Sequence, residues 1–362
     1  MIKKWNCFRK KSKKSTAEIV PHDVILNNGG TTTAAGTTVC TAVAAVVSTV
    51  VSTQSSTVRL YGSPTSVLAA YIRFALLHKG VSVRFVPSDT PNFGADAPVL
   101  QIGSETVSGS LETVLRYIDA RFPHPPLGVR SCEEEEDEEE EETTPSVVRA
   151  IALQHKSMTW HVERLVRWVE DLSTRGGKGS VDPTVGSPRM EMKKLARSYS
   201  ELLEVLLEHA QMEERVVFPI LERADRGICK AANEEHARDL PIMNGIKEGI
   251  KSIGVMDSGS PDYQEALSNL STRLKSLQEN SKQHFMEEDK DLLPFMEAVE
   301  LNKEQQKRVL EQCLDVMQGT HSHLFNFLLE GLLPCEAMQY LDLFISCNDR
   351  ERTASTLKLI ID

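Results

Sequence analysis

Residues 209–219, HAQMEERVVFP, and residues 284–294, HFMEEDKDLLP, repeat one pattern 75 positions apart. Each copy holds a histidine, a glutamate four residues later, a second acid directly after it, and a proline at the end. On a helix, residues i and i+4 share a face, so His209 would lie beside Glu213 and His284 beside Glu288. Imidazole and carboxylate from two separate helices suit a first-row transition metal, unlike a thiolate zinc site or an all-oxygen calcium site. The repeat predicts a metal bound inside a helix bundle.

Four long segments after Val147 carry apolar residues at alternating steps of three and four, the pattern of packed helices. A histidine lies on each apolar stripe, where burying a polar group without a partner costs free energy. The histidines and the two glutamates give six candidate ligands: His155, His209, Glu213, His236, His284 and Glu288. A set without sulfur favours one or two non-haem iron ions over manganese or zinc, and the carboxylates favour a bridged pair.

On these motifs, residues 147–300 resemble the hemerythrin-like, or HHE cation-binding, family. That family takes a His from helix one, HxxxE from helix two, HxxxH from helix three, and a His followed by a carboxylate from helix four. The resemblance implies ligand roles for the same six residues. Position 240, where the family has its second histidine of helix three, is Leu. The seventh ligand is therefore missing, and Glu235, Asp239 and His161 are the candidates to complete the set. His161 lies off the apolar stripe and is expected at the surface or just behind the ligands. Glu214 and Asp289 are expected to pair with Arg215 and Lys290 or to be solvated.

A small α/β unit is expected before the bundle. The pattern predicts strands at 58–61, 81–86 and 99–102 and helices at 67–79 and 111–122. LYGSPTS at 60–66, APVL at 97–100 and the Gly109-Ser110 turn resemble the N-terminal thioredoxin-fold domain of glutathione transferases. Gly109 stands where that family usually has an acid or Gln, and the Ser63–Ser66 turn has no cysteine. We therefore expect a degenerate domain kept for packing or partner binding, with Ser63 or Ser66 as a thiol-activating hydroxyl the alternative.

The fold class expected is mainly α: an up-down four-helix bundle with extra C-terminal helices, preceded by the thioredoxin-like domain and a disordered N-terminus. Its segments are a basic, low-complexity tail (1–57), the thioredoxin-like domain (58–122), a Pro-rich and acidic linker (123–146), the bundle (147–300) and a helical extension (301–362). In the extension, helices are expected at about 303–318, 320–333 and 335–346, capping the bundle or facing a partner. His321 and His323 are expected near solvent and not as ligands.

Charge, cysteine content and hydropathy argue against several kinds of function and location. Residues 133–142 are ten consecutive acids, which account for ten of the eleven net negative charges, and nucleic-acid binding has little support. The seven cysteines form no CxxC pair, which fits free thiols in a reducing, cytoplasmic or nuclear compartment. No apolar run reaches about 18 residues, so no membrane span is expected. Basic residues around Cys7 leave weak, peripheral contact with a membrane surface as an alternative to a solvated tail.

The function that the hemerythrin-like resemblance implies is iron binding without catalysis, in which the bundle senses or buffers iron, or binds dioxygen or another diatomic. The thioredoxin-like domain or the C-terminal helices would contact a protein partner in iron homeostasis. The alternative is an enzyme, either a diiron oxidase or a glutathione-dependent redox enzyme. A third interpretation is a metal-free scaffold whose histidines pair with glutamates, and it explains the repeat poorly.

Overall fold

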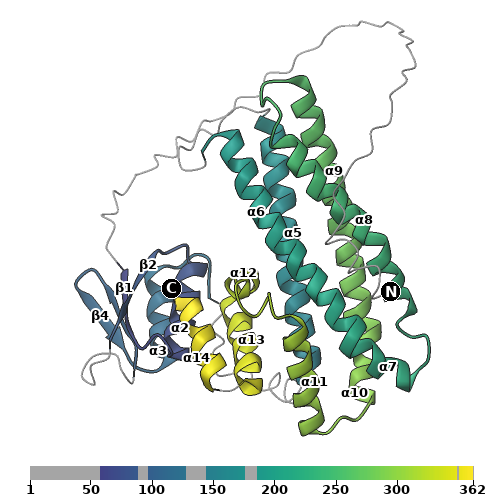
Figure 1. Ribbon diagram of the computed structural model, residues 1–362. Coiled ribbons are helices and arrows are strands. Elements are labelled where there is room, and N and C mark those ends of the chain that lie inside the picture. Colours follow the sequence, from purple (N-terminus) through teal and green to yellow (C-terminus); the bar gives the residue numbers. More distant parts are fainter. Residues whose placement is uncertain (1–57, 89–96, 128–143, 176–185, 349, 362) are drawn as a thin grey trace, which may run out of the picture. The chain divides into compact units, whose positions relative to one another are not determined.

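Four long helices form an up-down bundle in the computed structural model (Figure 1): α5 (Ser146–Arg175), α6 (Pro188–Met212), α8 (Lys230–Ile253) and α9 (Pro261–Glu287). Each contacts two neighbours, in the order α5, α6, α8, α9 and back to α5. The structure describes residues 58–88, 97–127, 144–175, 186–348 and 350–361. The expected tail at 1–57 and the acidic run at 133–142 lie outside the described residues.

Local sequence explains where two of the bundle helices begin. Ser187 and Ser260 have extended backbone, and each side chain accepts a hydrogen bond from the backbone N–H three residues later. A proline follows each serine, at a position where the missing N–H costs nothing. The Ser-Pro pairs therefore fix the entry of the chain into α6 and α9.

Both bundle helices that carry the repeat pass into a π-helical turn at the repeated glutamate. Helix α6 continues as η1 (Glu213–Val217) and then α7 (Phe218–Ala224), and α9 continues as η2 (Glu288–Leu292) and then α10 (Pro294–Ala298). In each turn the backbone N–H of the fifth following residue bonds to the glutamate carbonyl. Such π turns occur often at functional sites. Proline cannot donate to an α-helical ladder, so Pro219 and Pro294 favour a change of helix at these points.

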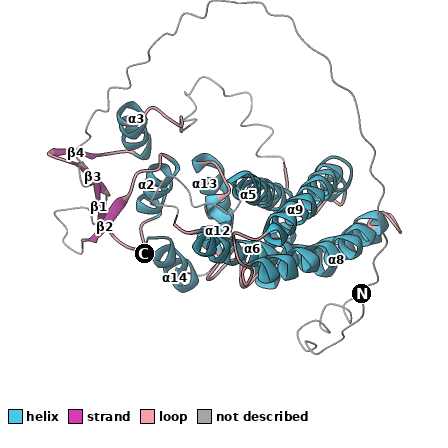
Figure 2. Ribbon diagram, turned by 90° about the horizontal axis from the view of Figure 1, so that it is seen from above, coloured by secondary structure: helices cyan, strands magenta, loops and turns pink. Residues whose placement is uncertain are grey.

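The α/β unit has one more strand than expected. Its sheet has the order β2-β1-β3-β4, with β1 (Val58–Gly62) parallel to β2 (Val83–Pro87) and antiparallel to β3 (Val99–Ile102). The missed strand β4 (Glu105–Ser108) is short and polar and pairs with β3 through a turn at Gly103, whose φ of 64° suits glycine. Helices α2 (Val67–His78) and α3 (Leu111–Arg121) cover one face of the sheet (Figure 2).

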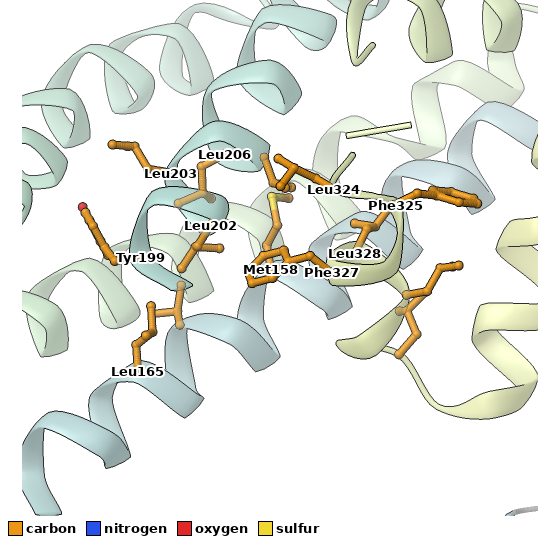
Figure 3. Packing of buried hydrophobic residues seen from close by; sticks show 14 of the residues in the cluster. Met158, Leu165, Tyr199, Leu202, Leu203, Leu206, Leu324, Phe325, Phe327 and Leu328 are labelled. Atoms are coloured by element: carbon orange, nitrogen blue, oxygen red, sulfur yellow. The ribbon is translucent and has the colours of Figure 1, made fainter. Parts of the chain in front are cut away.

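The C-terminal extension differs from its prediction in two places. The helices are α11 (Lys303–Val316), α12 (Phe325–Glu330), α13 (Pro334–Cys347) and α14 (Arg350–Ile361). The expected helix at 320–333 is shorter because residues 317–324 form turns, and α14 was not expected at all. Helix α13 contacts both α5 and α2, and α14 contacts α2. Figure 3 shows Leu324, Phe327 and Leu328 packed near Met158 of α5.

Most of the predicted stripes are buried in the bundle. Figure 3 shows Leu165 of α5 near Tyr199 and Leu202 of α6, and all three are at most 2 % exposed. Phe295, which follows the second copy of the repeat, is an exception because it is 41 % exposed. Among the described helices, a membrane-spanning apolar stretch is not found. The predicted fold class, a mainly α chain with a four-helix bundle and a small sheet before it, is confirmed.

Candidate metal centre

The structure brings all six predicted ligand residues together at one level of the bundle. They form two groups of ligand atoms, and within each group every atom lies within 4.8 Å of the others. The first group contains His155, His209, Glu213 and Glu288, and the second contains Glu213, His236, His284 and Glu288. The two glutamates belong to both groups. The two copies of the repeat thus supply the shared carboxylates, and each pair of histidines belongs to one group.

The Nε2 atoms of all four histidines face the shared carboxylates. His155 Nε2 lies 3.1 Å from His209 Nε2, and His236 Nε2 lies 3.1 Å from His284 Nε2. Glu213 reaches both pairs, with Oε1 at 3.1 Å from His209 Nε2 and Oε2 at 3.4 Å from His236 Nε2. Glu288 Oε2 lies 3.4 Å from His155 Nε2 and 3.5 Å from His284 Nε2. Each glutamate therefore faces one histidine of each pair.

The outward-facing Nδ1 atom of each histidine has its own acceptor. His155 Nδ1 lies 2.8 Å from Asp289 Oδ1, and His236 Nδ1 lies 3.3 Å from Glu214 Oε1. The expectation that these two acids pair with Arg215 and Lys290 or with water alone is therefore wrong, because each bonds to an imidazole. His284 Nδ1 lies 2.7 Å from Glu235 Oε2. His209 Nδ1 differs, since its partner is the neutral Gln154 Oε1 at 2.8 Å. Such hydrogen bonds orient metal-binding imidazoles.

The donor set fits a cation. In a neutral ring, a proton on Nδ1 toward the outer acceptor leaves the lone pair of Nε2 pointing inward, toward the carboxylates. Within the described part of the chain, Glu213 Oε2 and both oxygens of Glu288 are buried without a hydrogen-bond donor. Buried carboxylate oxygens without partners are costly unless a cation lies between them. The four histidines and two glutamates are at most 7 % exposed, and no sulfur takes part.

The buried imidazoles and carboxylates shift one another's pKa values. Burial by itself would lower the pKa of His155 and His236, but the hydrogen bonds that these rings donate to nearby carboxylates outweigh it and raise each pKa to about 10. Burial lowers the pKa of His209 and of His284. One imidazolium in each pair is the result. Burial and the charge of Glu213 raise the pKa of Glu288, whereas the imidazoles around Glu213 overcome burial and lower its pKa.

The residues considered for the seventh ligand are not part of either group. Leu240 is half-buried and packs against the apolar core, and Asp239 Oδ1 accepts from Asn280 at 2.9 Å. Glu235 holds His284 from outside. His161 was expected at the surface or just behind the ligands, which is wrong: it is 1 % exposed, and its Nε2 donates to the Phe327 carbonyl at 2.7 Å.

The two histidines of the extension have different environments. His323 is exposed and lies 3.3 Å from Glu204, as expected of a residue near solvent. His321, which was expected there too, is 3 % exposed, and its ring lies nearly parallel to the rings of Tyr340 and Phe344. The sequence did not predict this burial, because the neighbouring residues Tyr340 and Phe344 belong to another helix, α13. The described cysteines, at 229, 313, 335 and 347, are free thiols.

A cavity of about 720 Å³ reaches the first group from the surface. Its wall includes His155, Phe285 and Asp289 from the bundle and Leu332 and Leu333 from the extension. The ring of Phe285 stacks on His155 with centroids 4.4 Å apart. The Asp289 side chain is 43 % exposed, so this acid connects the cavity with a candidate ligand.

Comparison with known proteins identifies the bundle. The family model described as the hemerythrin HHE cation binding domain matches residues 146–296. Among solved structures, the crystal structure of maleylacetoacetate isomerase from Anaeromyxobacter dehalogenans is similar, with 18% sequence identity and a TM-score of 0.19. The match covers 44% of this chain and 65% of that chain. The matched range contains all six candidate ligands, and the domain together with its buried His and Glu residues suits the binding of non-haem iron. Residues 146–296 of this chain therefore form a hemerythrin-like HHE cation-binding domain.

Proposed function

We propose that the protein binds two non-haem iron ions in the bundle, and that its role is iron or oxygen sensing in iron homeostasis. The observation that carries the proposal is the sharing of Glu213 and Glu288 between two groups that each contain two histidines. His155 and His209 would hold one ion, His236 and His284 the other, and the glutamates would bridge them. Ferrous and ferric ions accept such nitrogen and oxygen ligands, and bridging carboxylates are typical of iron pairs in helix bundles.

Sensing follows from the position of these residues in the core. A bound ion stabilises the folded state by an amount that grows with the free metal concentration, because the unfolded chain lacks the assembled ligands. Without metal, the bundle must bury two carboxylates and four imidazoles against one another. Iron occupancy therefore changes how tightly α5, α6, α8 and α9 pack, and a partner that contacts the described surface of the extension would detect that change.

The test is the iron content of purified protein together with its melting temperature. Wild-type protein is expected to hold two ions. His209→Ala removes a ligand from the first group only and is expected to leave one ion, whereas His209→Ala with His284→Ala leaves none and lowers the melting temperature of iron-treated protein. His323→Ala is the matched control, because this exposed histidine belongs to neither group. Iron content that is unchanged in the double variant would leave only the metal-free scaffold.

An enzymatic role is the second candidate, and the cavity beside His155 favours it. Each group offers four protein ligand atoms, fewer than the six that iron often takes, so open positions would remain for dioxygen or another small molecule. The cavity would give such a molecule access. Turnover of dioxygen or peroxide above that of free iron, lost in His155→Ala, would support the enzyme. No turnover by protein that holds two ions would favour the sensor.

The glutathione-dependent variant of the enzyme depends on Ser63 and Ser66. The Ser66 hydroxyl already caps helix α2 by accepting from the Ala69 N–H, and Ser63 Oγ lies 3.0 Å from Thr65 Oγ1. Glutathione conjugation that falls in Ser63→Ala would support that activity. Equal rates in Ser63→Ala and wild type would exclude Ser63 as the activating group.

A further inference from the structure

A buried chain of polar side chains connects the candidate ligand His209 with the C-terminal extension. His209 Nδ1 lies 2.8 Å from Gln154 Oε1, and Gln154 Nε2 donates to the Tyr340 hydroxyl at 2.8 Å. The same hydroxyl lies 2.7 Å from His321 Nε2, and His321 Nδ1 lies 2.9 Å from the Met317 carbonyl oxygen. All four side chains are at most 3 % exposed. The chain thus leads from α6 through α5 and α13 to the turn after α11.

The environment of His321, at the end of this polar chain, determines the direction of every hydrogen bond in it. Two backbone carbonyls, of Met317 and Leu314, face His321 Nδ1, and a carbonyl oxygen can only accept. Nδ1 therefore carries the proton. Burial lowers the pKa of His321 to about 4, so the ring is neutral and Nε2 is an acceptor. The single hydroxyl proton of Tyr340 must then go to His321.

The same reasoning determines the tautomer of the candidate ligand His209. Since the Tyr340 proton is used toward His321, the Tyr340 oxygen can only accept from Gln154. The amide NH₂ of Gln154 therefore faces Tyr340, and its carbonyl oxygen faces His209. An acceptor at this place requires the Nδ1–H tautomer of His209, which leaves the Nε2 lone pair free toward the shared carboxylates.

We infer that Tyr340 and His321 are positioning residues of the metal centre, which act through Gln154 to hold His209 in the tautomer that binds metal. The inference rests on the proposed function. Both residues lie outside the matched range 146–296, so the extension completes a centre whose ligands all come from the bundle. The other three histidines need no such help, because Asp289, Glu214 and Glu235 can accept a proton whichever oxygen they present.

Tyr340→Phe breaks the chain at its middle. The Gln154 amide would then be free to turn and donate to His209 Nδ1, which would place the proton on Nε2 and block the first group. Anaerobic titration with Co²⁺ is expected to show affinity for one of the two ions reduced about tenfold or more, the range for lost hydrogen bonds to ligands. Affinity for the second ion is expected to be unchanged.

Two further variants separate orientation from general packing. Tyr199→Phe is the matched control, because the hydroxyl of this buried tyrosine donates to the Met243 carbonyl at 2.7 Å and not to a member of the polar chain. It should bind both ions as wild type does. Gln154→Glu in the Tyr340→Phe background supplies a carboxylate to His209 and is expected to restore the first ion, which a purely structural defect would not allow.

A spectroscopic signature gives a second measurement. In Co²⁺-loaded protein, the Nδ1–H protons of the four ligand histidines give solvent-exchangeable, hyperfine-shifted NMR signals. Tyr340→Phe is expected to shift or remove the signal of His209 alone, and Gln154→Met, which leaves the extension intact, to do the same.

The outcomes are distinct for the two proposals. Wild-type binding of both ions in Tyr340→Phe and in Gln154→Met would overturn this inference and leave the proposed function standing. Wild-type protein that binds no metal would overturn both. If Tyr340→Phe fails to fold, Gln154→Met decides the inference alone, since it changes no residue of the extension.

Discussion

Two buried histidines on the same helix differ in pKa because different groups surround each ring. His155 and His161 are both on α5 and both buried, but His155 faces carboxylates and His161 faces the Phe327 carbonyl and stacks on the Phe327 ring. Carboxylates overcome burial and raise the pKa of His155 to about 10, whereas burial and the charge of Arg164 lower the pKa of His161 to about 3. The environment therefore separates a candidate ligand from a neutral core residue.

The lowered pKa of His161 predicts part of the acid sensitivity of the fold. In the unfolded chain this ring takes up a proton below about pH 6.5, and in the folded chain only below about 3. Stability that is present above pH 6.5 is thus lost as the pH falls toward 3, by up to about 5 kcal/mol for this group. Urea unfolding between pH 7 and 4 is expected to show a shallower loss for His161→Gln than for wild type. The exposed His323→Gln is the control, and equal slopes in all three proteins would contradict the prediction.

At the scale of elements, the repeat matters because it ends two helices in the same way. Each glutamate is the first residue of a π turn, so the side chain points into the bundle while the chain after it is displaced by the extra residue. The second acids, Glu214 and Asp289, then reach the outer nitrogens of His236 and His155. One local motif thus supplies both a carboxylate shared by the two groups and an outer hydrogen bond to a histidine on another helix.

The turn between α12 and α13 depends on a close approach to α5. A Cβ at Gly331 would lie 2.5 Å from Ser157 Oγ and 2.8 Å from the Ser157 carbonyl oxygen. Because backbone cannot move aside cheaply, Gly331→Ala is expected to lower the free energy of unfolding by about 1–3 kcal/mol. In Gly249→Ala the new Cβ meets only Leu270 at 3.8 Å inside α8, where alanine favours the helix by about 1 kcal/mol. Chemical denaturation should give opposite signs for the two variants, and a neutral Gly331→Ala would show that the turn can shift.

For the whole molecule, hydrogen bonds and apolar packing join the extension both to the bundle and to the α/β unit. Helix α13 carries Tyr340, which bonds to Gln154 of α5, and Asp342, which accepts from the Tyr71 hydroxyl of α2. Ala70, Tyr71 and Phe74 of α2 share one apolar cluster with the bundle helices and the extension. Continuous contacts therefore connect Gln154, beside the candidate ligand His209, with helix α2.

The proposed site predicts a stability that depends on iron. At free iron about 100 times the dissociation constant, each bound ion adds about 2.7 kcal/mol to the free energy of unfolding. Anaerobic thermal melts with and without ferrous iron are expected to differ by several degrees, and a chelator should remove the difference. In the variant with His209→Ala and His284→Ala the two melts should coincide. A similar shift in that variant would mean that iron stabilises the fold at another place.

The sequence by itself determined the bundle, the small sheet before it and the six residues that converge, because each depends on local periodicity. A stripe at steps of three and four identifies a buried face, and a histidine and glutamate at i and i+4 on that face are recognisable without a partner helix. The short polar strand β4 and helix α14 lacked such a pattern and were missed.

Only the tertiary structure decided how the carboxylates are shared and what holds each ring. Gln154 meets Tyr340 across 186 positions of sequence, and His155 meets Asp289 across 134. Contacts between residues so far apart produce no periodic pattern in the sequence, because they depend on which faces of separate helices pack together. The burial of His161 and His321 was missed for the same reason: the groups that enclose them, at Phe327 and at Tyr340 and Phe344, belong to other elements of the fold.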